Sequence, residues 1–417
     1  MDSLPGSGEL CGAMMRDAGF APNFFAALTA AGMPVVPTEF SVVPHHQVVP
    51  AFVLQQIDRF IRVFDRVTTS EAWRRVVQPD APSIARRHRP ECCFFSCWDF
   101  HLPPQGDCQL IEFNDNGSGI LFAAIINAVY HEMAKPAASQ GIAAPPSLSL
   151  FRQHVAAFVD QEARAFFGTW SAGMLLILDD RESLQQGKFR HEFQMLRDMF
   201  HAAGWETGIG CPADLSWNGG QLLFDRRPVA FVVNRSTDFL WDSHEFAALR
   251  EAYAASAVYV APNPFTYTTR SDKRLLEYLS LPDWDAALEI HPEERRILTA
   301  HVPESYVVRP DNVDMLASRK QDFVFKPLHG FAGRGLLGSG EVGQARLRRL
   351  TRQHEGYLAQ RRVAKAALPV DGASVWTDLR IWAYRGEIFG LSGRASRRED
   401  RLDLTPPGGW LPTYAGT

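Results

Sequence analysis

Apolar and polar positions along this chain alternate between strand-like and helix-like patterns. Two continuous apolar runs, MLLILDD at 174–180 and VAFVVNR at 229–235, are typical of buried strands. Between them, HEFQMLRDMFHAAGW at 191–205 has its apolar residues at helical spacing, and a further strand-like run, VYVAPNP, follows at 258–264. Strands that alternate with helices in this way predict a doubly wound α/β domain at about 170–265.

The N-terminal third has a different pattern. Residues 23–80 predict helices around a strand-like stretch, MPVVPTEFSVV at 33–43. Strands are predicted at 91–101 and 108–114 and a helix at 119–134, and KPAASQGIAAPPSLS at 135–149 is the clearest linker. We therefore predict an N-terminal part to residue 135, and a linker with a helix over 136–169.

The last third, residues 266–417, predicts an α+β arrangement. Its expected elements, in chain order, are a helix in SDKRLLEYLS, two strands around a glycine loop in DFVFKPLHGFAGRGLL, a strand in GYLAQRRVA and two strands around a turn in TDLRIWAYRGEIFGLSGRAS.

Composition is that of an ordinary globular protein. The 417 residues are 46% hydrophobic and 22% charged, and the formal net charge is −4 with both signs interspersed, which argues against nucleic acid as a partner. The start, MDSLPGSGEL, lacks the features of a signal peptide, and no apolar run reaches membrane-spanning length. We expect a cytoplasmic protein with no membrane partner; the sequence does not predict its oligomeric state.

Six cysteines are few for this length and do not suit a disulfide scaffold. The stretch ECCFFSCWDFH could supply Cys93, Cys97 and His101 to zinc, but the paired CxxC hooks of a structural zinc site are missing. The alternative is a set of buried thiols in a reducing cytoplasm.

The stretch DCQLIEFNDNGSG at 107–119 ends a predicted strand on polar residues. Glu112 and Asn114 share one face because alternate strand residues point the same way. A hairpin loop centred between Gln105 and Gly106 would place Asp99 opposite Glu112, and the two carboxylates would repel each other unless a divalent cation lay between them. Carboxylate and amide oxygens suit Mg²⁺. The alternative remains open that Glu112 caps the following helix and Asp99 is solvated.

A lysine ends the predicted strand in FVFKPLHGFAGRGLL at 323–337. Lys326 shares a face with Val324, and a lysine that ends a buried strand needs an anion or a route to solvent. Glycines follow, at 330, 333 and 335, and they allow main-chain N–H groups to approach a phosphate closely. The lysine precedes the glycines, so this is not a Walker A motif. The alternative is a surface lysine before a hairpin loop.

The third stretch, TDLRIWAYRGEIFGLSGRAS at 377–396, carries Arg380 and Arg394 on either side of a central Arg385–Gly386. With a two-residue turn at its central RG, Arg380 would lie opposite Leu391, and Arg394 would fall on the other face. Both arginines could converge on one anion only through a β-bulge, for which Gly390 or Gly393 is the natural place. The alternative is an exposed charged hairpin.

Together, LIEFNDNGSG, FVFKP with GFAGRG, YLAQRRV and DLRIWAYRGEIFGLSGRAS resemble the motifs of the ATP-grasp superfamily. The Glu-x-Asn motif precedes the lysines, an order similar to that of circularly permuted ATP-grasp proteins such as glutathionylspermidine synthase. The stretch 234–280 resembles their pre-ATP-grasp region. The resemblance covers about 90–417 and implies a pre-ATP-grasp α/β domain beside a permuted ATP-grasp domain.

The resemblance also implies roles for individual residues. Lys273 and Lys326 would contact ATP phosphates, a loop with Gly330, Gly333 and Gly335 would close over them, Gln360 would lie beside the adenine, and Asp378 would belong to the nucleotide site. Asp99, Glu112 and Asn114 would hold Mg²⁺, with Mn²⁺ as a substitute, and Arg380 and Arg394 would meet the transferred phosphoryl group.

The implied activity is ATP-dependent ligation of a carboxylate to an amine through an acyl phosphate. The substrates would be small molecules such as an amino acid, a peptide or a polyamine. The chain departs from the family at Cys97, where glutathionylspermidine synthase has an arginine, and in TPPGGW and ASRREDRLDL near the end, so the substrate stays open. A phosphotransferase and a catalytically silent binding protein of the same fold are the alternatives.

Overall fold

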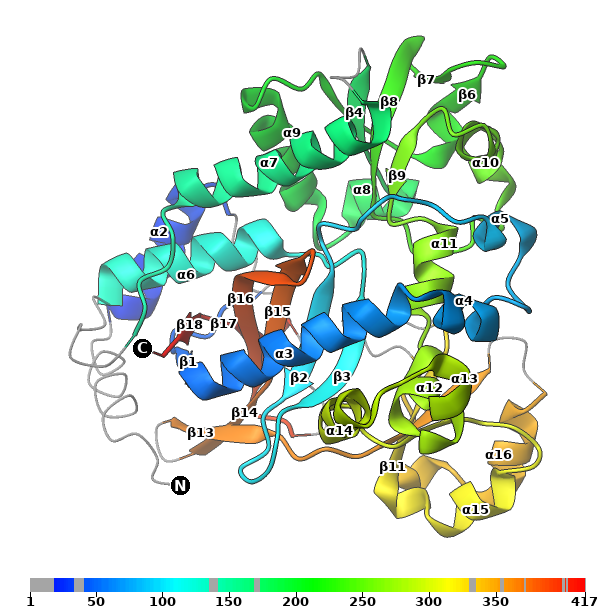
Figure 1. The fold of residues 1–417 in the computed structure, drawn as a ribbon. Coiled ribbons are helices and arrows are strands. Elements are labelled where there is room, and N and C mark those ends of the chain that lie inside the picture. Colours follow the sequence, from blue (N-terminus) through cyan, green and yellow to red (C-terminus); the bar gives the residue numbers. More distant parts are fainter. Residues whose placement is uncertain are drawn as a thin grey trace.

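The computed structural model describes residues 19–33, 41–134, 142–168, 173–329, 335–352, 356–370, 373–399, 402 and 404–416. These residues form a mixed α/β architecture with sheets of two, three, six and seven strands (Figure 1). The smallest sheet pairs β1 (Gln47–Val49) in parallel with β18 (Thr413–Ala415) and so joins the two ends of the described chain.

The seven-stranded sheet is antiparallel and mixes both ends of the sequence. Its strands are β2 (Cys97–His101), β3 (Gln109–Asn114), β13 (Ala366–Val370), β14 (Ala373–Thr377), β15 (Leu379–Tyr384), β16 (Glu387–Ser396) and β17 (Gly408–Leu411). The order is β13-β14-β16-β15-β2-β3, with β17 against β16. Because β2 pairs with β15, the predicted 91–114 hairpin lies directly beside the predicted 377–396 hairpin.

The six-stranded sheet confirms the predicted strand–helix–strand alternation. Four parallel strands lie in the order β5 (Thr207–Gly210), β4 (Met174–Leu178), β8 (Arg227–Asn234) and β9 (Tyr259–Ala261), and the hairpin β6 (Leu215–Trp217)–β7 (Leu222–Phe224) pairs with β8. Residues of α7 (Leu148–Phe167) and α9 (Arg190–Ala202) pack with one face of the parallel strands, and residues of α10 (Ala247–Ala254) pack with the other. The sheet is therefore doubly wound.

The three-stranded sheet, β10 (Ser305–Val307), β12 (Tyr357–Arg361) and β11 (Phe323–Pro327), carries the predicted lysine. Phe323 and Phe325 face a core shared with α15 (Val313–Ser318) and α16 (Gln344–Leu350), so Val324 and Lys326 face the other way, as predicted. The second strand expected after the glycine loop amounts to one bridge, Phe325 to Leu337.

Helix α3 (Ala51–Thr68) covers the apolar face of β2 and β3 (Figure 1). Its buried residues Ile57, Phe60, Ile61 and Phe64 recur at helical spacing and form one core with Trp98, Phe100, Leu110 and Phe113. Burying such side chains contributes about 1.5–3 kcal/mol each. This packing turns Asp99 and Glu112 to the opposite face of the sheet.

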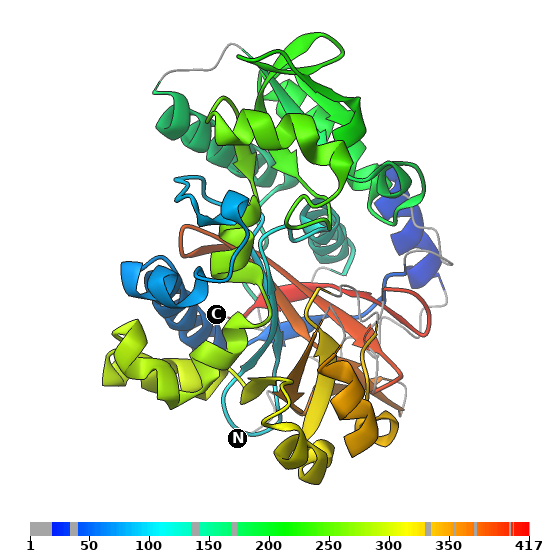
Figure 2. The same cartoon turned by 90° about the vertical axis from the view of Figure 1, so that its right-hand side faces the viewer.

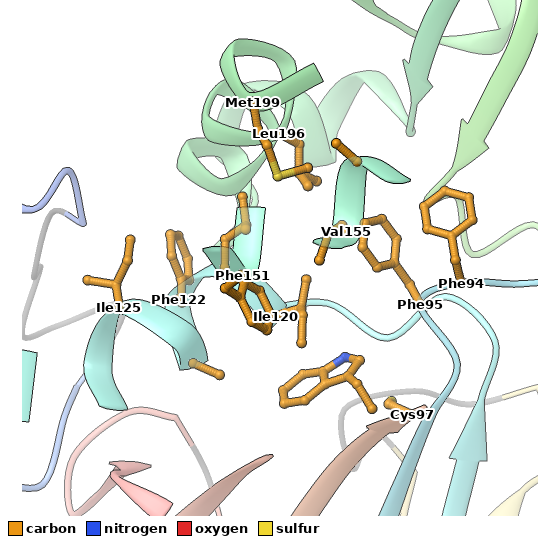
Figure 3. Close-up of a cluster of buried hydrophobic side chains, with 14 of the residues drawn as sticks. Phe94, Phe95, Cys97, Ile120, Phe122, Ile125, Phe151, Val155, Leu196 and Met199 are labelled. Carbon is orange, nitrogen blue, oxygen red and sulfur yellow. The ribbon is translucent and has the colours of Figure 1, made fainter. Parts of the chain in front are cut away.

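Helix α6 (Ile120–Ala134) links the seven-stranded sheet to the α/β part. It is apolar on most sides, and its Ile120, Phe122 and Ile125 pack with residues of α7 and α9 (Figure 3). Figure 2 shows the α/β part, in green, lying over one end of the seven-stranded sheet, which is called the central sheet below.

The remaining helices complete the covering of the sheets. They are α2 (Phe20–Ala30), α4 (Glu71–Val77), α5 (Ser83–Arg86), α8 (Arg181–Gln186), α11 (Pro264–Thr266), a π-helical turn (Tyr267–Ser271), α12 (Leu275–Ser280), α13 (Asp285–Leu288), α14 (Pro292–His301) and five short 3-10 turns at 212–214, 244–246, 282–284, 320–322 and 339–341. Within the described ranges, no helix has the length and apolar character needed to cross a membrane.

Several element expectations are revised. The strand predicted at 91–101 begins only at Cys97, and of the stretch 33–43 the residues 34–40 lie outside the described chain, while Val42 forms a single bridge to Trp410. Of the predicted linker, 135–141 are likewise outside, and the predicted domain limits stay a prediction.

The zinc alternative gains no support. Cys93 and Cys97 are free, buried thiols, and His101 directs Nδ1 at the Val363 carbonyl, 3.3 Å away. Among the residues that the structure describes, no cluster of three or more His, Cys, Asp or Glu side chains could hold a metal ion. Burial raises the pKa of the Cys97 thiol to about 12, which is the behaviour of an inert core cysteine.

Candidate active site

The β2–β3 hairpin brings Asp99 and Glu112 together. The two residues are directly paired across the strands, and Cys97 pairs with Asn114 at the strand ends. Paired residues of antiparallel strands have their Cβ atoms about 5 Å apart. The sequence-based expectation that Asp99, Glu112 and Asn114 share one face is therefore met by the register.

The loop reaches this register by a route that the sequence did not predict. Phe100 pairs with Leu110 and His101 with Gln109, so the hairpin is centred on Gln105, and a β-bulge then shifts the pairing by one residue. Ile111 is the extra residue of the bulge. Without it, Glu112 would have turned toward the apolar core under α3.

The alternative roles for these two acids do not fit the structure. Asp99 is 2% exposed and is not solvated. The N-terminus of α6 is capped by Glu192, whose carboxylate accepts hydrogen bonds from the main-chain N–H groups of Gly119 (2.8 Å) and Leu121 (3.1 Å). Glu112 is thus left, partly exposed, on the polar face of the sheet, and the space over this face is called the cleft below.

The β15–β16 hairpin brings the two arginines to the same face. Its turn has positive φ at Arg385 (49°) and Gly386 (79°), as in a type I′ turn. Beyond it, a bulge at Phe389 shifts the pairing, so Arg380 pairs with Ser392 and not with the predicted Leu391. Arg394 then shares the face of Ser392. The predicted convergence through a bulge is correct, and the bulge lies one residue before Gly390.

The convergence point of the arginines is Asp99 itself. Arg380 donates from Nε (2.6 Å) and Nη2 (2.7 Å) to the two carboxylate oxygens, and Arg394 donates from Nη2 to Oδ2 (2.9 Å). Burial alone would raise the pKa of the Asp99 carboxyl, but the charges of Arg380 and Arg394 outweigh it and lower the pKa to about 2. Asp99 therefore stays ionised over the physiological pH range.

One row of cross-strand neighbours crosses the polar face of the sheet: Glu112, Asp99, Arg380 and Ser392. Asp99 stands between an acid on one side and a base on the other, and in this structure its carboxylate is turned toward the base.

Glu112 meets the first of the two predicted lysines. Its Oε1 lies 3.3 Å from Nζ of Lys273, which follows the π-helical turn, and the Glu112 side chain is 26% exposed. Burial would raise the pKa of Glu112, but the charge of Lys273 and of more distant cations lowers it. Asn114 is partly exposed beside them and lines a narrow pocket with Asp115, Lys273 and Leu328.

Lys326 connects the three-stranded sheet to this face. Its ammonium donates to the carbonyl oxygen of Ile111 (3.0 Å), the bulged residue of β3, and to Oε1 of Gln360 on β12 (2.6 Å). Burial lowers the pKa of Lys326 to about 8, and the charge of Glu112 opposes that effect in part. The bulge therefore does two things: it turns Glu112 toward the cleft and directs a carbonyl to the lysine.

The predicted glycine loop is described only in part. Gly330 and Gly333 lie outside the described residues. Gly335 has a φ of +72°, and a Cβ there would come within 2.8 Å of Pro327 Cγ, so only glycine fits without adjustment.

Two aromatic rings beside Asn114 were not predicted. The rings of Phe239 and Tyr267 stack with centroids 4.5 Å apart and an interplanar angle of 3°, and both residues line the pocket that holds Asn114. The Tyr267 hydroxyl lies 2.9 Å from Nδ1 of His329, the last described residue before the glycine loop. These residues come from three separate segments and follow no common periodicity, so no sequence pattern could have grouped them.

Two other hollows lie away from this face. One, of about 790 Å³, is lined by residues of α3, α4, α13 and α14, and the other, of about 480 Å³, by α8, α9 and β5. Each contains an ion pair between two of its lining residues, Arg295 with Asp285 in the first and Arg181 with Asp214 in the second. Neither shows the convergence of unlike charges from several sheets that marks the cleft.

A nucleotide fits the donors and acceptors of the cleft. Gln360 is 1% exposed, its Oε1 is used by Lys326, and its Nε2 has no hydrogen-bond partner among the described residues. A buried amide N–H without a partner costs free energy, so a ligand acceptor such as a ring nitrogen would satisfy it. Lys326 and Lys273 both lie beside β3 on the polar face of the sheet, where their positive charges suit phosphate groups.

Mg²⁺ fits two of the three expected ligands as they stand. Glu112 and Asn114 are partly exposed and carry oxygen atoms, and protein-bound Mg²⁺ in nucleotide sites commonly uses one or two carboxylates together with substrate phosphates. Asp99 has both oxygens bonded to arginine and would have to exchange a partner.

The fold and the cleft together define a mixed α/β protein of several sheets, consistent with an ATP-grasp-like fold. Among solved structures, the chain resembles a glutathione synthetase-like effector from Globodera pallida in its apo form, with a TM-score of 0.64, 10% identity and full coverage of both chains. A likeness at this identity shows a common fold; the circular permutation and the pre-ATP-grasp assignment stay predictions.

Two weaker likenesses point to proteins named as synthetases. One is to a putative gamma-glutamylcysteine synthetase from Methylobacillus flagellatus KT (TM-score 0.48, 11% identity, 84% of this chain and 83% of that one). The other is to D-alanyl-alanine synthetase A from Vibrio cholerae O1 biovar eltor (TM-score 0.28, 10% identity, 58% and 88%). Both are too distant to support an argument. No protein-family model and no curated protein sequence matches this chain.

Proposed function

We propose that this protein is an ATP-dependent ligase that joins a small carboxylate to an amine through an acyl phosphate. The observation that carries the proposal is the hydrogen bond from Lys326 to the Ile111 carbonyl. It joins the three-stranded sheet, which carries Lys326 and Gln360, to β3, which carries Glu112. Arg380 and Arg394 complete the cleft from β15 and β16.

The charges of the cleft suit a polyphosphate. The cleft brings together four cations, Lys273, Lys326, Arg380 and Arg394, from four different segments of the chain. Glu112 and Asn114 would hold Mg²⁺ or Mn²⁺, which when bound supplies the positive charge that neutralises the triphosphate. Lys273 and Lys326 would bind the phosphates, and Gln360 would donate to the base. Such sites act by positioning and by electrostatic stabilisation.

The chemistry has two steps. A carboxylate oxygen of the first substrate attacks the γ-phosphorus of ATP, and the bond to the bridging oxygen breaks, so ADP leaves and an acyl phosphate forms. The amine nitrogen of the second substrate then attacks the acyl carbon, an amide forms, inorganic phosphate leaves and the amine loses a proton. Arg380 and Arg394 would hold the transferred phosphoryl group.

Phosphate release tests this proposal. Purified protein with Mg-ATP is screened against amino acids, short peptides and polyamines, singly and in pairs. A ligase releases phosphate and ADP only when a suitable carboxylate and amine are both present. Release of ADP with one substrate alone, together with a stable phosphorylated product, would show a phosphotransferase; no turnover despite measured Mg-ATP binding would show a binding protein.

A further inference from the structure

The two arginines of the cleft are held in different ways. Both donate to Asp99, and both lie on the polar face of the central sheet. They differ in what else holds each guanidinium, and that difference separates their roles within the proposed ligase site, on which this inference rests.

Arg394 has a second carboxylate partner. Asp378 accepts hydrogen bonds from the main-chain N of Arg394 at Oδ1 (2.7 Å) and from its Nε at Oδ2 (2.8 Å), and Nη2 also lies 2.6 Å from Oδ2. Because one carboxylate bonds both the main chain and the side chain of Arg394, the guanidinium is tied to the strand that carries it.

Asp378 is itself fixed by the fold. It follows β14 directly and is 1% exposed. Its main-chain N donates to the Arg394 carbonyl (3.1 Å), and its main-chain oxygen accepts from Nε2 of Gln47 (2.8 Å). This carboxylate has little freedom to turn toward a ligand.

Arg380 has one carboxylate partner. Among the described residues, its guanidinium hydrogen-bonds to Asp99 alone, through Nε and Nη2, and its Cζ lies 5.9 Å from the centroid of the Trp382 ring. If a cation bound beside Glu112 drew Asp99 away from Arg380, Arg380 would lose its partner while Arg394 would keep Asp378.

We infer that Asp378 is a positioning residue that fixes Arg394 in the cleft, and that Arg380 is the exchangeable arginine, held by Asp99 until the site is loaded. Asp378 then acts through Arg394 and does not touch the nucleotide. Arg394 is a preorganised contact for the phosphoryl group, and Arg380 becomes available to the substrate when Asp99 changes partner.

Arginine side-chain NMR tests the asymmetry without any need for activity. Protein labelled with ¹⁵N-arginine gives Nε–Hε signals that survive when the guanidinium is held, and Arg380→Lys and Arg394→Lys identify the two signals by their loss. Asp378→Asn should speed the exchange of the Arg394 proton about tenfold or more and spare Arg380, because a single hydrogen bond of about 1.4 kcal/mol corresponds to a factor of ten. Asp99→Asn should do the reverse.

The inference is overturned if the Arg394 signal survives Asp378→Asn unchanged, or if each variant affects both arginines alike. Circular dichroism and thermal melts check that both variants fold. If Asp378→Asn does not fold, the chemical rescue experiment described next is done with Asp378→Ser in its place.

Chemical rescue tests the same point in the working enzyme. Guanidinium at low millimolar concentration should raise kcat of Arg394→Ala about tenfold, because Asp378 can hold the added cation, and should do so less than about twofold when Asp378 is also replaced. KM for ATP should stay unchanged in both. Equal rescue with and without Asp378 would overturn the inference. A wild-type protein that neither binds nor turns over Mg-ATP would instead count against the proposed function, and the NMR result would stand apart from it.

Discussion

Two regions of this molecule gather buried charge, and they do so with different partners. In the cleft of the central sheet, Asp99 and Glu112 are bonded to the side chains of Arg380, Arg394 and Lys273. At the carboxyl edge of the parallel sheet, the acids Asp179 and Glu192 are bonded to main-chain N–H groups.

The second region is also more completely enclosed. Glu192 is 0% and Arg235 4% exposed, and Arg235 donates to the Gly117 carbonyl (3.2 Å) while lying 3.8 Å from Glu192. Burial raises the pKa of Asp179 to about 7. In the cleft, by contrast, the side chains of Glu112 and Arg394 are 26% and 24% exposed.

The difference indicates which buried charges a ligand could bind. A side-chain cation can be exchanged for a phosphate or a metal ion without disturbing the backbone, whereas an N–H group at a helix start is part of the fold. We therefore expect replacements in the cleft to change ligand binding and turnover, and replacements at the sheet edge to change stability.

The largest effect is expected for Glu112→Gln. Turnover should fall about 10²–10³-fold, as for loss of one strong electrostatic contact in a catalytic site, because a Mg²⁺ ion that neutralises the triphosphate would lose its proposed carboxylate ligand. Thermal melts should be almost unchanged. Steady-state kinetics of this variant are compared with Glu387→Gln, which changes an exposed acid on β16. Full activity in Glu112→Gln would contradict the proposal that the cleft is the active site.

The opposite behaviour is expected for Glu192→Gln. The free energy of unfolding should fall by about 3 kcal/mol, because the charge of buried Arg235 loses its partner and the cap of α6 is weakened. Urea titration measures this change. If the variant still folds, its affinity for Mg-ATP should equal that of the wild type. A loss of affinity in a stably folded variant would contradict the expectation that the sheet edge serves stability and not ligand binding.

A smaller effect is expected for Lys326→Met. The affinity for Mg-ATP should fall about 10–100-fold, in line with about 1.5–3 kcal/mol for hydrogen bonds to a charged group. Lys320→Met, on the short turn before β11, is the matched control and should bind normally. Competition with a fluorescent nucleotide gives both constants, and equal affinity in the two variants would show that Lys326 serves only the fold.

The smallest effect concerns pH. Burial lowers the pKa of Lys326 to about 8 in the free protein, and a bound triphosphate would raise it again. Between those two pKa values, binding takes up one proton, so the affinity for Mg-ATP should fall as pH rises above 8, by up to about tenfold per unit. Calorimetry at pH 8.5 in two buffers of different ionisation enthalpy measures the uptake, which should vanish in Lys326→Met.

Strand parity accounts for what the sequence could predict of the site. The alternation at Glu112 and Asn114, and the need for a bulge between the two arginines, follow from residues two apart pointing the same way. The strands of the parallel sheet followed from their apolar runs, because a strand covered on both faces has no polar side.

The rest depended on contacts between distant segments. The bulge at Ile111 lets Leu110 and Phe113 pack in the core with α3 while Glu112 lies on the opposite face of the sheet. The pairing of Arg380 with Asp99 joins residues 281 positions apart, and no local pattern records it. For the same reason the sequence assigned Asp99 to a metal ion without revealing its two arginine partners.

The most direct test of the account is calorimetric titration of the protein with ATP, once with Mg²⁺ and once with a chelator. We expect saturable binding with Mg²⁺, weaker binding in chelator, and a reduced dependence on Mg²⁺ in Glu112→Gln, because Glu112 and Asn114 are the partly exposed oxygen-bearing side chains that we propose as metal ligands. Absence of binding heat at millimolar Mg-ATP, with no rise in the melting temperature, would contradict it.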